Sequence, residues 1–104
     1  NNQWADTGET ASVGFAVETH ELSVSYVAPS SAKKVSDSIS KTGYYPIGIV
    51  GVSFSTKQTT IDLMSATLSG RTSGSAAVAI YVYNNDSSSS GALTAYIAVL
   101  WIKE

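Results

Sequence analysis

The stretch KTGYYPIGIVGVSFS, residues 41–55, is apolar on both faces of an extended chain. Strict two-residue alternation gives two faces: Tyr45, Ile47, Ile49, Gly51 and Ser53 on one, and Tyr44, Pro46, Gly48, Val50, Val52 and Phe54 on the other. A sheet in a sandwich normally keeps one face in water. The stretch therefore predicts a strand that packs on the core with one face and whose other apolar face must be covered by another part of the protein or by a partner. Gly48 and Gly51 permit a bulge, and Pro46 favours a strand entrance or an edge position.

Two other segments, one before and one after this stretch, alternate in the same way and predict the core. AAVAIYVY sets Val78, Ile80 and Val82 on one face, and ELSVSYV sets Leu22, Val24 and Tyr26 on one face. The last apolar segment, ALTAYIAVLWIK, puts five apolar side chains on one face: Leu93, Ala95, Ile97, Val99 and Trp101. TIDLMSATLSG fits either a short helix or a strand, and its Thr and Ser content favours a strand.

The segments between these runs are rich in turn-forming residues. NNDSSSSG, residues 84–91, predicts a loose hairpin loop that joins two long antiparallel strands and places Tyr81, Tyr83 and Tyr96 in one hairpin. We expect about seven strands, near residues 11–18, 22–28, 34–40, 45–54, 60–69, 76–83 and 92–102. This pattern indicates an all-β protein, an antiparallel β-sandwich or jelly roll. Residues 1–104 form one domain, with 1–10 as an extended N-terminal segment or a connection to an upstream region.

The composition excludes several classes of function. Charged residues are 13% of the chain, against about 25% in typical globular domains, and Ser and Thr replace them. The net charge is −2, without a basic stripe, so we expect no nucleic-acid partner. Apolar runs are far shorter than the ~20 residues that span a bilayer, so we expect no membrane insertion. There is no cysteine, hence no disulfide or thiolate ligand.

The sequence offers no convincing catalytic or metal-binding group. His20 is the only histidine. In a strand it shares a side with Glu18 but not with Glu21, and two ligands without a third make a poor metal site. The eight acids have no spacing that selects a catalytic pair, and no GxSxG or phosphate-binding glycine motif occurs. We therefore expect no enzyme activity, no cofactor and no metal, and the sequence singles out no ligand-binding residue.

Residues 92–102 are also apolar on both faces, since Tyr96, Ala98, Leu100 and Ile102 lie opposite the five side chains named above. These two strands with two apolar faces predict association with copies of the same chain, centred on the segments around Ile49 and Val99. Aliphatic side chains left in water favour aggregation, and symmetric association is an economical way to cover them. The alternative is that loops or a curled sheet cover that face within one protomer.

The block KTGYYPIGIVGVSFS, preceded by VSDSIS (35–40), resembles a recurring C-terminal domain of bacteriophage and prophage tail proteins from Gram-positive hosts. SGRTSGSA and the closing YIAVLWIKE follow in the same order, so the resemblance covers residues 35–104. It implies a β-sandwich head, usually trimeric, at the tip of a tail fibre or baseplate protein of the extracellular virion. Such a head contacts a host-surface glycan or protein, and ligand contacts are expected in the loops around 55–60, 70–75 and 84–91.

Two alternatives remain open at this level. One is a carbohydrate-binding module of a secreted protein, which would use exposed tyrosines or Trp4 to stack on sugars. The other is a purely architectural subunit of a tube or filament without a ligand.

Overall fold

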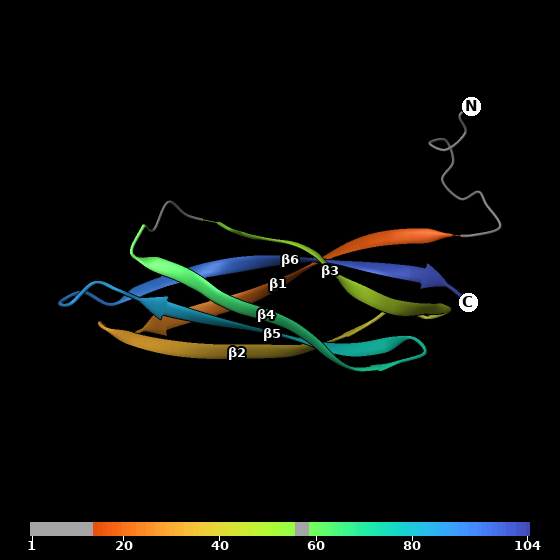
Figure 1. The fold of residues 1–104 in the computed structure, drawn as a ribbon, viewed down its shortest axis with the longest axis horizontal. Helices are drawn as coiled ribbons and strands as arrows, with labels where there is room; N and C mark the ends of the chain where they lie inside the picture. Colours follow the sequence, from red (N-terminus) through yellow and green to blue (C-terminus); the bar gives the residue numbers. More distant parts are fainter. Residues whose placement is uncertain (1–13, 56–58) are drawn as a thin grey trace, which may run out of the picture.

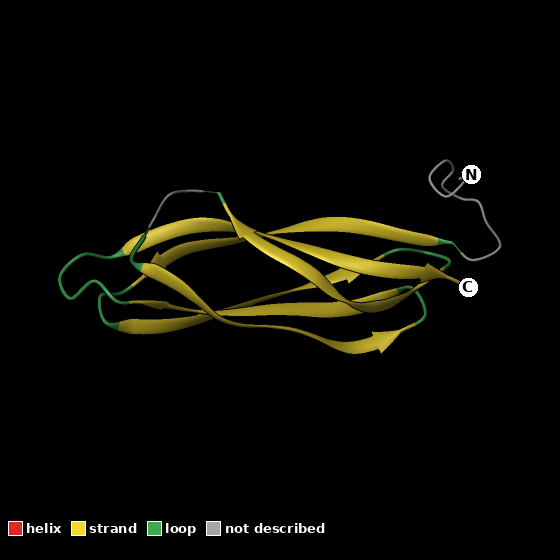
Figure 2. Cartoon of the chain, turned by 45° about the horizontal axis from the view of Figure 1, so that its top comes forward, coloured by secondary structure: helices red, strands yellow, loops and turns green. Residues whose placement is uncertain are grey.

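In the computed structural model, which describes residues 14–55 and 59–104, the chain forms two stacked antiparallel sheets and the described residues contain no helix (Figures 1 and 2). The six strands are β1 (Phe15–Val27), β2 (Ser31–Ser40), β3 (Tyr44–Phe54), β4 (Ile61–Thr72), β5 (Ser75–Asn84) and β6 (Gly91–Lys103). The all-β class is confirmed, in two antiparallel sheets of three strands each, and the ambiguous TIDLMSATLSG segment is a strand, β4. The predicted N-terminal segment 1–10 lies outside the described residues.

The two sheets have the strand orders β1-β6-β3 and β2-β5-β4. Of the connections between consecutive strands, only the one from β4 to β5 joins neighbours in a sheet. The predicted hairpin of β5 and β6 is therefore wrong: residues 85–90 cross from one sheet to the other. Each of these two strands carries a fully apolar face and takes the centre of its own sheet, where that face can be covered completely.

The first strand is longer than predicted. The expected strands at 11–18 and 22–28 are one continuous strand, β1, so the described residues hold six strands and not seven. Thr19, His20 and Glu21 keep their pairing with β6. Thr19 and Glu21 point outward and are exposed, so these polar side chains reach water without interrupting the backbone ladder. A register shift between Val24 and Val27 turns Tyr26 outward, against the predicted alternation, and leaves its side chain 53% exposed.

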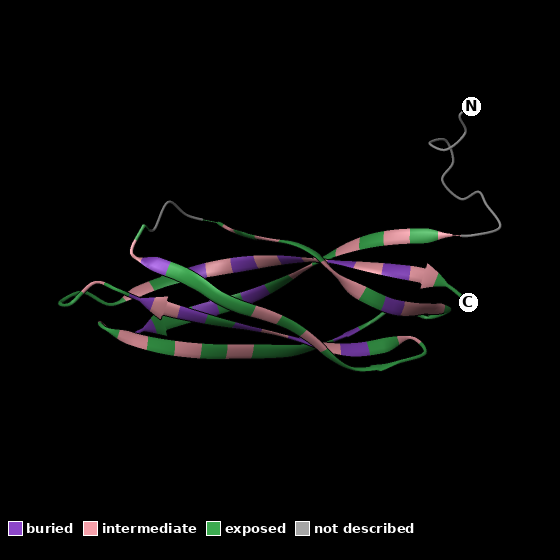
Figure 3. Cartoon of the chain, viewed as in Figure 1, coloured by how far each residue is buried: buried purple, intermediate pink, exposed green. Residues whose placement is uncertain are grey.

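The core lies between the two central strands. Val78, Ile80 and Val82 of β5 and Ile97, Val99 and Trp101 of β6 are each at most 1% exposed, as their alternation predicted. Figure 3 shows the buried positions recurring along both strands. Burying each aliphatic side chain contributes about 1.5–3 kcal/mol, so these two strands supply most of the stabilisation of the fold.

Strand β3 differs from simple alternation. Its pairing with β6 shifts register between Pro46 and Gly48 and again between Ile49 and Gly51. Each bulge adds one residue and inverts the faces. Ile49 consequently packs against the core opposite Val99, whereas Val50 points outward and is 56% exposed. The prediction from simple alternation is therefore wrong for Ile49 and Val50, which lie on each other's expected face. The bulges that Gly48 and Gly51 suggested are confirmed.

Candidate functional site

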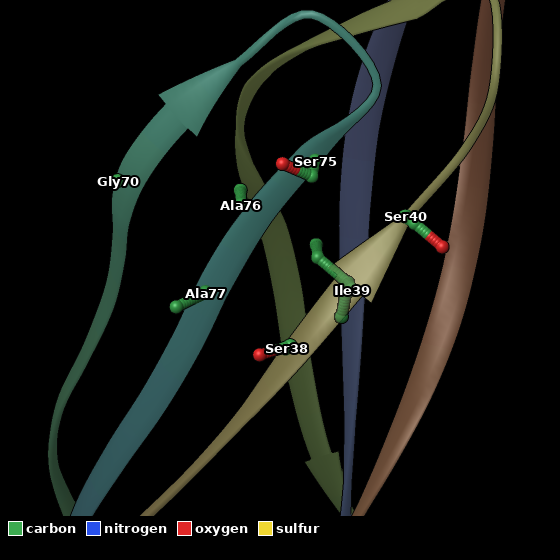
Figure 4. A pocket seen from close by; sticks show the side chains of 7 residues that line it. All are labelled: Ser38, Ile39, Ser40, Gly70, Ser75, Ala76 and Ala77. Atoms are coloured by element: carbon green, nitrogen blue, oxygen red, sulfur yellow. The ribbon is translucent and has the colours of Figure 1, made fainter.

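The face of the second sheet carries an open depression of about 480 Å³ near the β4–β5 hairpin (Figure 4). Its lining comes from the ends of three strands: Ser38, Ile39, Ser40, Gly70, Ser75, Ala76 and Ala77. The hollow exists because these side chains are small. Serine hydroxyls can donate and accept hydrogen bonds, but a serine nucleophile needs an adjacent base, and none of the seven residues is one. The sequence signal for this hollow is the alternating serines of VSDSIS opposite the alanines of β5.

His20 and Glu18 share one side of β1, as predicted, and the structure shows that this is the inner side. The two residues pair with the buried Ile97 and Val99, whereas Glu21 lies on the other side. The His20 ring meets the Trp101 ring edge-on, with centroids 6.5 Å apart. In the part of the chain that the structure describes, no three His, Cys, Asp or Glu side chains come together in a way that could hold a metal ion.

Glu18 is bound to a lysine instead. Its Oε2 accepts a hydrogen bond from Lys41 Nζ at 2.7 Å, and this bond lowers the pKa of the Glu18 carboxyl and raises the pKa of the Lys41 ammonium. Lys41 Nζ also lies 4.5 Å from the centroid of the Tyr44 ring. The pair thus ties β1 to the turn between β2 and β3, which is a structural role for the start of the KTGYYP block.

The three loops expected to contact a ligand do not meet at one place. Ser55, Thr59 and Thr60 lie at the same end as residues 84–91, where Asn85 N donates to Thr60 O at 2.8 Å, and residues 56–58 lie outside the described part. The loop between β1 and β2 joins them, because Ser30 N donates to Asp86 O at 3.0 Å. We call the described parts of these three connections, residues 28–30, 59–60 and 85–90, the loop end. The 70–75 turn lies at the opposite end, beside the C-terminus (Figure 1).

The loop end is organised by one buried side chain, Asn84, which is fully buried. Its Nδ2 donates to Val27 O at 3.1 Å and to Ser89 O at 2.9 Å, and its Oδ1 accepts from Asp86 N at 3.0 Å. These bonds join the ends of β1 and β5 to the 85–90 loop. The sequence marked Asn84 only as a turn residue and predicted a loose loop. The dense Asn and Asp content of NNDSSSSG was the available signal for an ordered one.

Asp86 completes this arrangement. Its Oδ1 accepts hydrogen bonds from the backbone N–H of Ser88 at 2.9 Å and of Ser89 at 3.0 Å, and these bonds lower the pKa of the Asp86 carboxyl. Asn85 Nδ2 donates to Asp62 Oδ2 at 2.8 Å and so anchors the loop to β4. The exposed Ser87 and Ser90 side chains are therefore presented by an ordered backbone.

The tyrosines expected in one hairpin lie on opposite faces. Tyr81, 46% exposed, and Tyr83 are on the outer face of the second sheet. Tyr96 pairs with Glu21 on the outer face of the first sheet. Trp4 lies outside the described residues.

The outer face of the first sheet is apolar over the half nearer the chain termini. We call this surface the apolar face; its members are Phe15, Val17, Ile47, Val50, Leu100 and Ile102. Phe15, Val17 and Val50 are each more than half exposed. The side chains around Ile49 and Val99 on which the predicted interface was centred point the other way, into the core. The exposed apolar surface is formed instead by their sequence neighbours, Val50 and Leu100 among them.

Comparison of this chain with known proteins found no matching family, no matching curated protein and no matching solved structure. Between residues 14 and 55 and between 59 and 104, no helix is long and apolar enough to cross a membrane.

Proposed function

We propose that this chain is a non-enzymatic structural and receptor-binding domain of a phage tail fibre or baseplate, which contacts a glycan or protein of the host surface through its loop end. The tail assignment rests on the resemblance of residues 35–104 to tail-protein domains. The geometry of the chain supports an attachment role, and the single observation that carries it is the separation of the loop end from Gly14 and Glu104, the two ends of the described chain.

The described body measures 53 × 29 × 16 Å, with its strands along the long dimension (Figure 1). Strand β1 begins and β6 ends at one end, where Lys103 N donates to Gly14 O at 2.8 Å. Gly14, where the described chain begins, and Glu104 therefore both lie at that end. The loop end points away from it, in the position that an attachment tip requires.

The loop end also has suitable chemistry. Asn85, Ser87 and Ser90 offer exposed amide and hydroxyl groups, which are donors and acceptors matched to sugar hydroxyls. Because Asn84 and Asp86 already hold the backbone, binding would cost little ordering entropy.

The test is binding of the fluorescently labelled 104-residue chain to glycan arrays and to cell envelopes from a panel of Gram-positive bacteria. Ser87→Arg combined with Ser90→Arg is expected to weaken envelope binding at least about tenfold, or ~1.4 kcal/mol. Thr42→Arg, an exposed position at the opposite end, is the matched control and should bind as the unchanged chain does. Equal loss in both variants, or no binding by the unchanged chain, would refute the proposal. Polymers seen by negative stain without envelope binding would favour a purely architectural subunit.

A second candidate function, a carbohydrate-binding module, is favoured by Tyr81. Its ring is 46% exposed at the centre of the second sheet's outer face, with Lys34 and Ser65 as its partners on either side. An exposed ring between polar neighbours can stack on a sugar. Loss of glycan binding in Tyr81→Ala, with binding kept in the Ser87 and Ser90 double variant, would select this function over the first.

A further inference from the structure

We propose that the free edge of β4 is a docking site for an extended segment of another protein, which adds to the second sheet as a further strand. The partner is defined by its chemistry: a peptide strand with apolar side chains at alternate positions and uncharged polar ones between them. The inference goes beyond the proposed function and does not depend on it, because it concerns an edge of the sandwich and not the loop end.

Strand β4 has backbone groups without a partner along its outer edge. In the sheet order β2-β5-β4 its neighbour is β5, and residues Ser65–Ser69 form a regular ladder with Ala77–Tyr81. Among the described residues, no other backbone group forms a hydrogen bond with this stretch. In a strand with one neighbour, the backbone N–H and C=O groups on the other side remain unpaired. An extended peptide is the ligand that matches such a row of donors and acceptors.

The other three edge strands carry features that oppose strand addition. Charged side chains lie in the middle of β1 and β2: Glu18, Glu21, Lys33, Lys34 and Asp37. Strand β3 contains Pro46 and two bulges. Charges, proline and bulges are the usual means by which proteins block a sheet edge. From Leu63 to Gly70, β4 has neither a charged residue nor a proline, so its edge is the least protected of the four.

The side chains on the inner side of this edge are apolar and only partly covered. Ala66 and Leu68 of β4 pack against the core but stay partly exposed, and so do Val52 and Phe54 of β3, which contacts β4 across the sandwich. A strand added to β4 would point every second side chain toward this inner side. Covering it therefore requires apolar residues at alternate positions of the partner. Thr67, on the outer side, is exposed, so the partner's other side chains meet water and can be polar.

Two exposed apolar side chains extend the site toward the loop end. A bulge leaves Met64 without a partner on β5 and puts Leu63 and Met64, which are 40% and 59% exposed, in succession along the edge. Methionine is flexible and adapts to apolar surfaces of different shapes. Met64 thus offers the added strand an apolar contact beside the backbone ladder.

The bulges at the two ends of this stretch favour a single peptide over a second copy of the chain. The pairing of β4 shifts register between Leu63 and Ser65 and again between Ser69 and Thr72. Each bulge bends the strand and increases its twist. A second β4 would bring its own bulges on a rigid sandwich, so two copies could align only over the short ladder between them. A separate peptide can follow the bend at both ends.

The first test measures binding of synthetic peptides of about ten residues to the full chain by fluorescence anisotropy. The peptides alternate Val, Ile or Leu with Ser or Thr and carry a lysine at each end for solubility. Each is matched with a peptide of the same composition whose apolar residues form one block. We expect alternating peptides to bind at least about tenfold more tightly than their block partners.

Met64→Lys places a charge at the β4 edge and should weaken this binding at least about tenfold. Ser36→Lys, an exposed position on the β2 edge of the same sheet, is the matched control and should bind as the unchanged chain does. Circular dichroism of both variants shows that they are folded.

A second test separates backbone pairing from apolar contact. Two versions of the best peptide are N-methylated at alternate residues, one at the odd and one at the even positions. Because successive N–H groups of a strand point to opposite edges, one version should lose binding and the other should keep it. In hydrogen exchange followed by NMR, the bound peptide should protect alternate amides between Ser65 and Ser69 and leave those of β2 unchanged.

Four outcomes would overturn the inference: no preference for alternating peptides, equal binding of the two methylated versions, protection at another edge, or equal effects of Met64→Lys and Ser36→Lys. Self-association of the chain that Met64→Lys abolishes, without peptide binding, would also overturn it, since the occupant would then be a second copy. Failure of the proposed function looks different: the chain would bind the alternating peptides but no envelope or glycan.

Discussion

Replacing Asn84 with alanine tests whether one buried amide holds the loop end together. The substitution removes the two bonds that Nδ2 donates, to Val27 O and Ser89 O, and the bond that Oδ1 accepts from Asp86 N. A net hydrogen bond contributes about 1 kcal/mol, and a buried group left unpaired costs about 1–3 kcal/mol. Because the Val27 carbonyl loses its Asn84 donor inside the protein, we expect a loss of about 2–4 kcal/mol, a large share of the ~5–15 kcal/mol of a typical domain.

The assay is urea unfolding followed by tryptophan fluorescence at low protein concentration, where self-association does not contribute. With a slope of about 2 kcal/mol per molar urea, the middle of the usual range, the midpoint should fall by roughly 1–2 M. Hydrogen exchange at the amide of Asp86 should accelerate more than exchange at Ile80, in the middle of β5, because the loop end opens before the core does.

The neighbouring asparagine provides the control. Asn85 makes one exposed side-chain bond, to Asp62, so Asn85→Ala should change the free energy of unfolding by no more than about 0.5 kcal/mol. Equal effects of the two substitutions, or an Asn84→Ala variant within 0.5 kcal/mol of the unchanged chain, would refute the role assigned to Asn84.

Three further predictions concern the core, the loop end and β3. Trp101→Ala should lower the free energy of unfolding, measured by heat or urea, by about 3–5 kcal/mol. Trp101→Phe should lower it clearly less, because the phenylalanine variant also removes a buried indole N–H that has no acceptor among the described residues. The pKa of the Asp86 carboxyl is lowered in the folded protein, so the stability contributed by the carboxylate is present above the unfolded pKa of ~3.9 and is lost as pH falls through the folded pKa. Hydrogen exchange at the amides of Ser88 and Ser89 should then accelerate as the pH is lowered. Asp86→Asn should remove this pH dependence of exchange. Gly48→Ala should raise the stability of the protomer by about 0.4–1 kcal/mol, and a loss would show that β3 needs glycine for its own fold.

The sequence determined the class of fold and the residues of the core. The alternation of residues 76–83 and 92–102 identified Val78, Ile80, Val82 and the inner side of β6, because side chains in any strand point to alternate faces whatever its partner. The same rule placed His20 and Glu18 on one side, away from Glu21. The local chemistry of NNDSSSSG and of Gly48 and Gly51 likewise located a reversal and the bulges.

The tertiary structure alone decided which strands pair, and with that where the candidate surfaces lie. Residues adjacent in sequence, β5 and β6, were expected to pair, but each carries a face that only the other sheet can cover, so they lie in different layers. The two bulges exchanged Ile49 and Val50, which moved the exposed apolar surface from the side chains first suspected to their neighbours. Alternation along β5 puts Asn84 on the inner face after Val82, but only the approach of the β1 end and of the 85–90 loop supplies the Val27 and Ser89 carbonyls that its amide binds. In each case the outcome depends on contacts between distant segments, which local side-chain patterns do not specify.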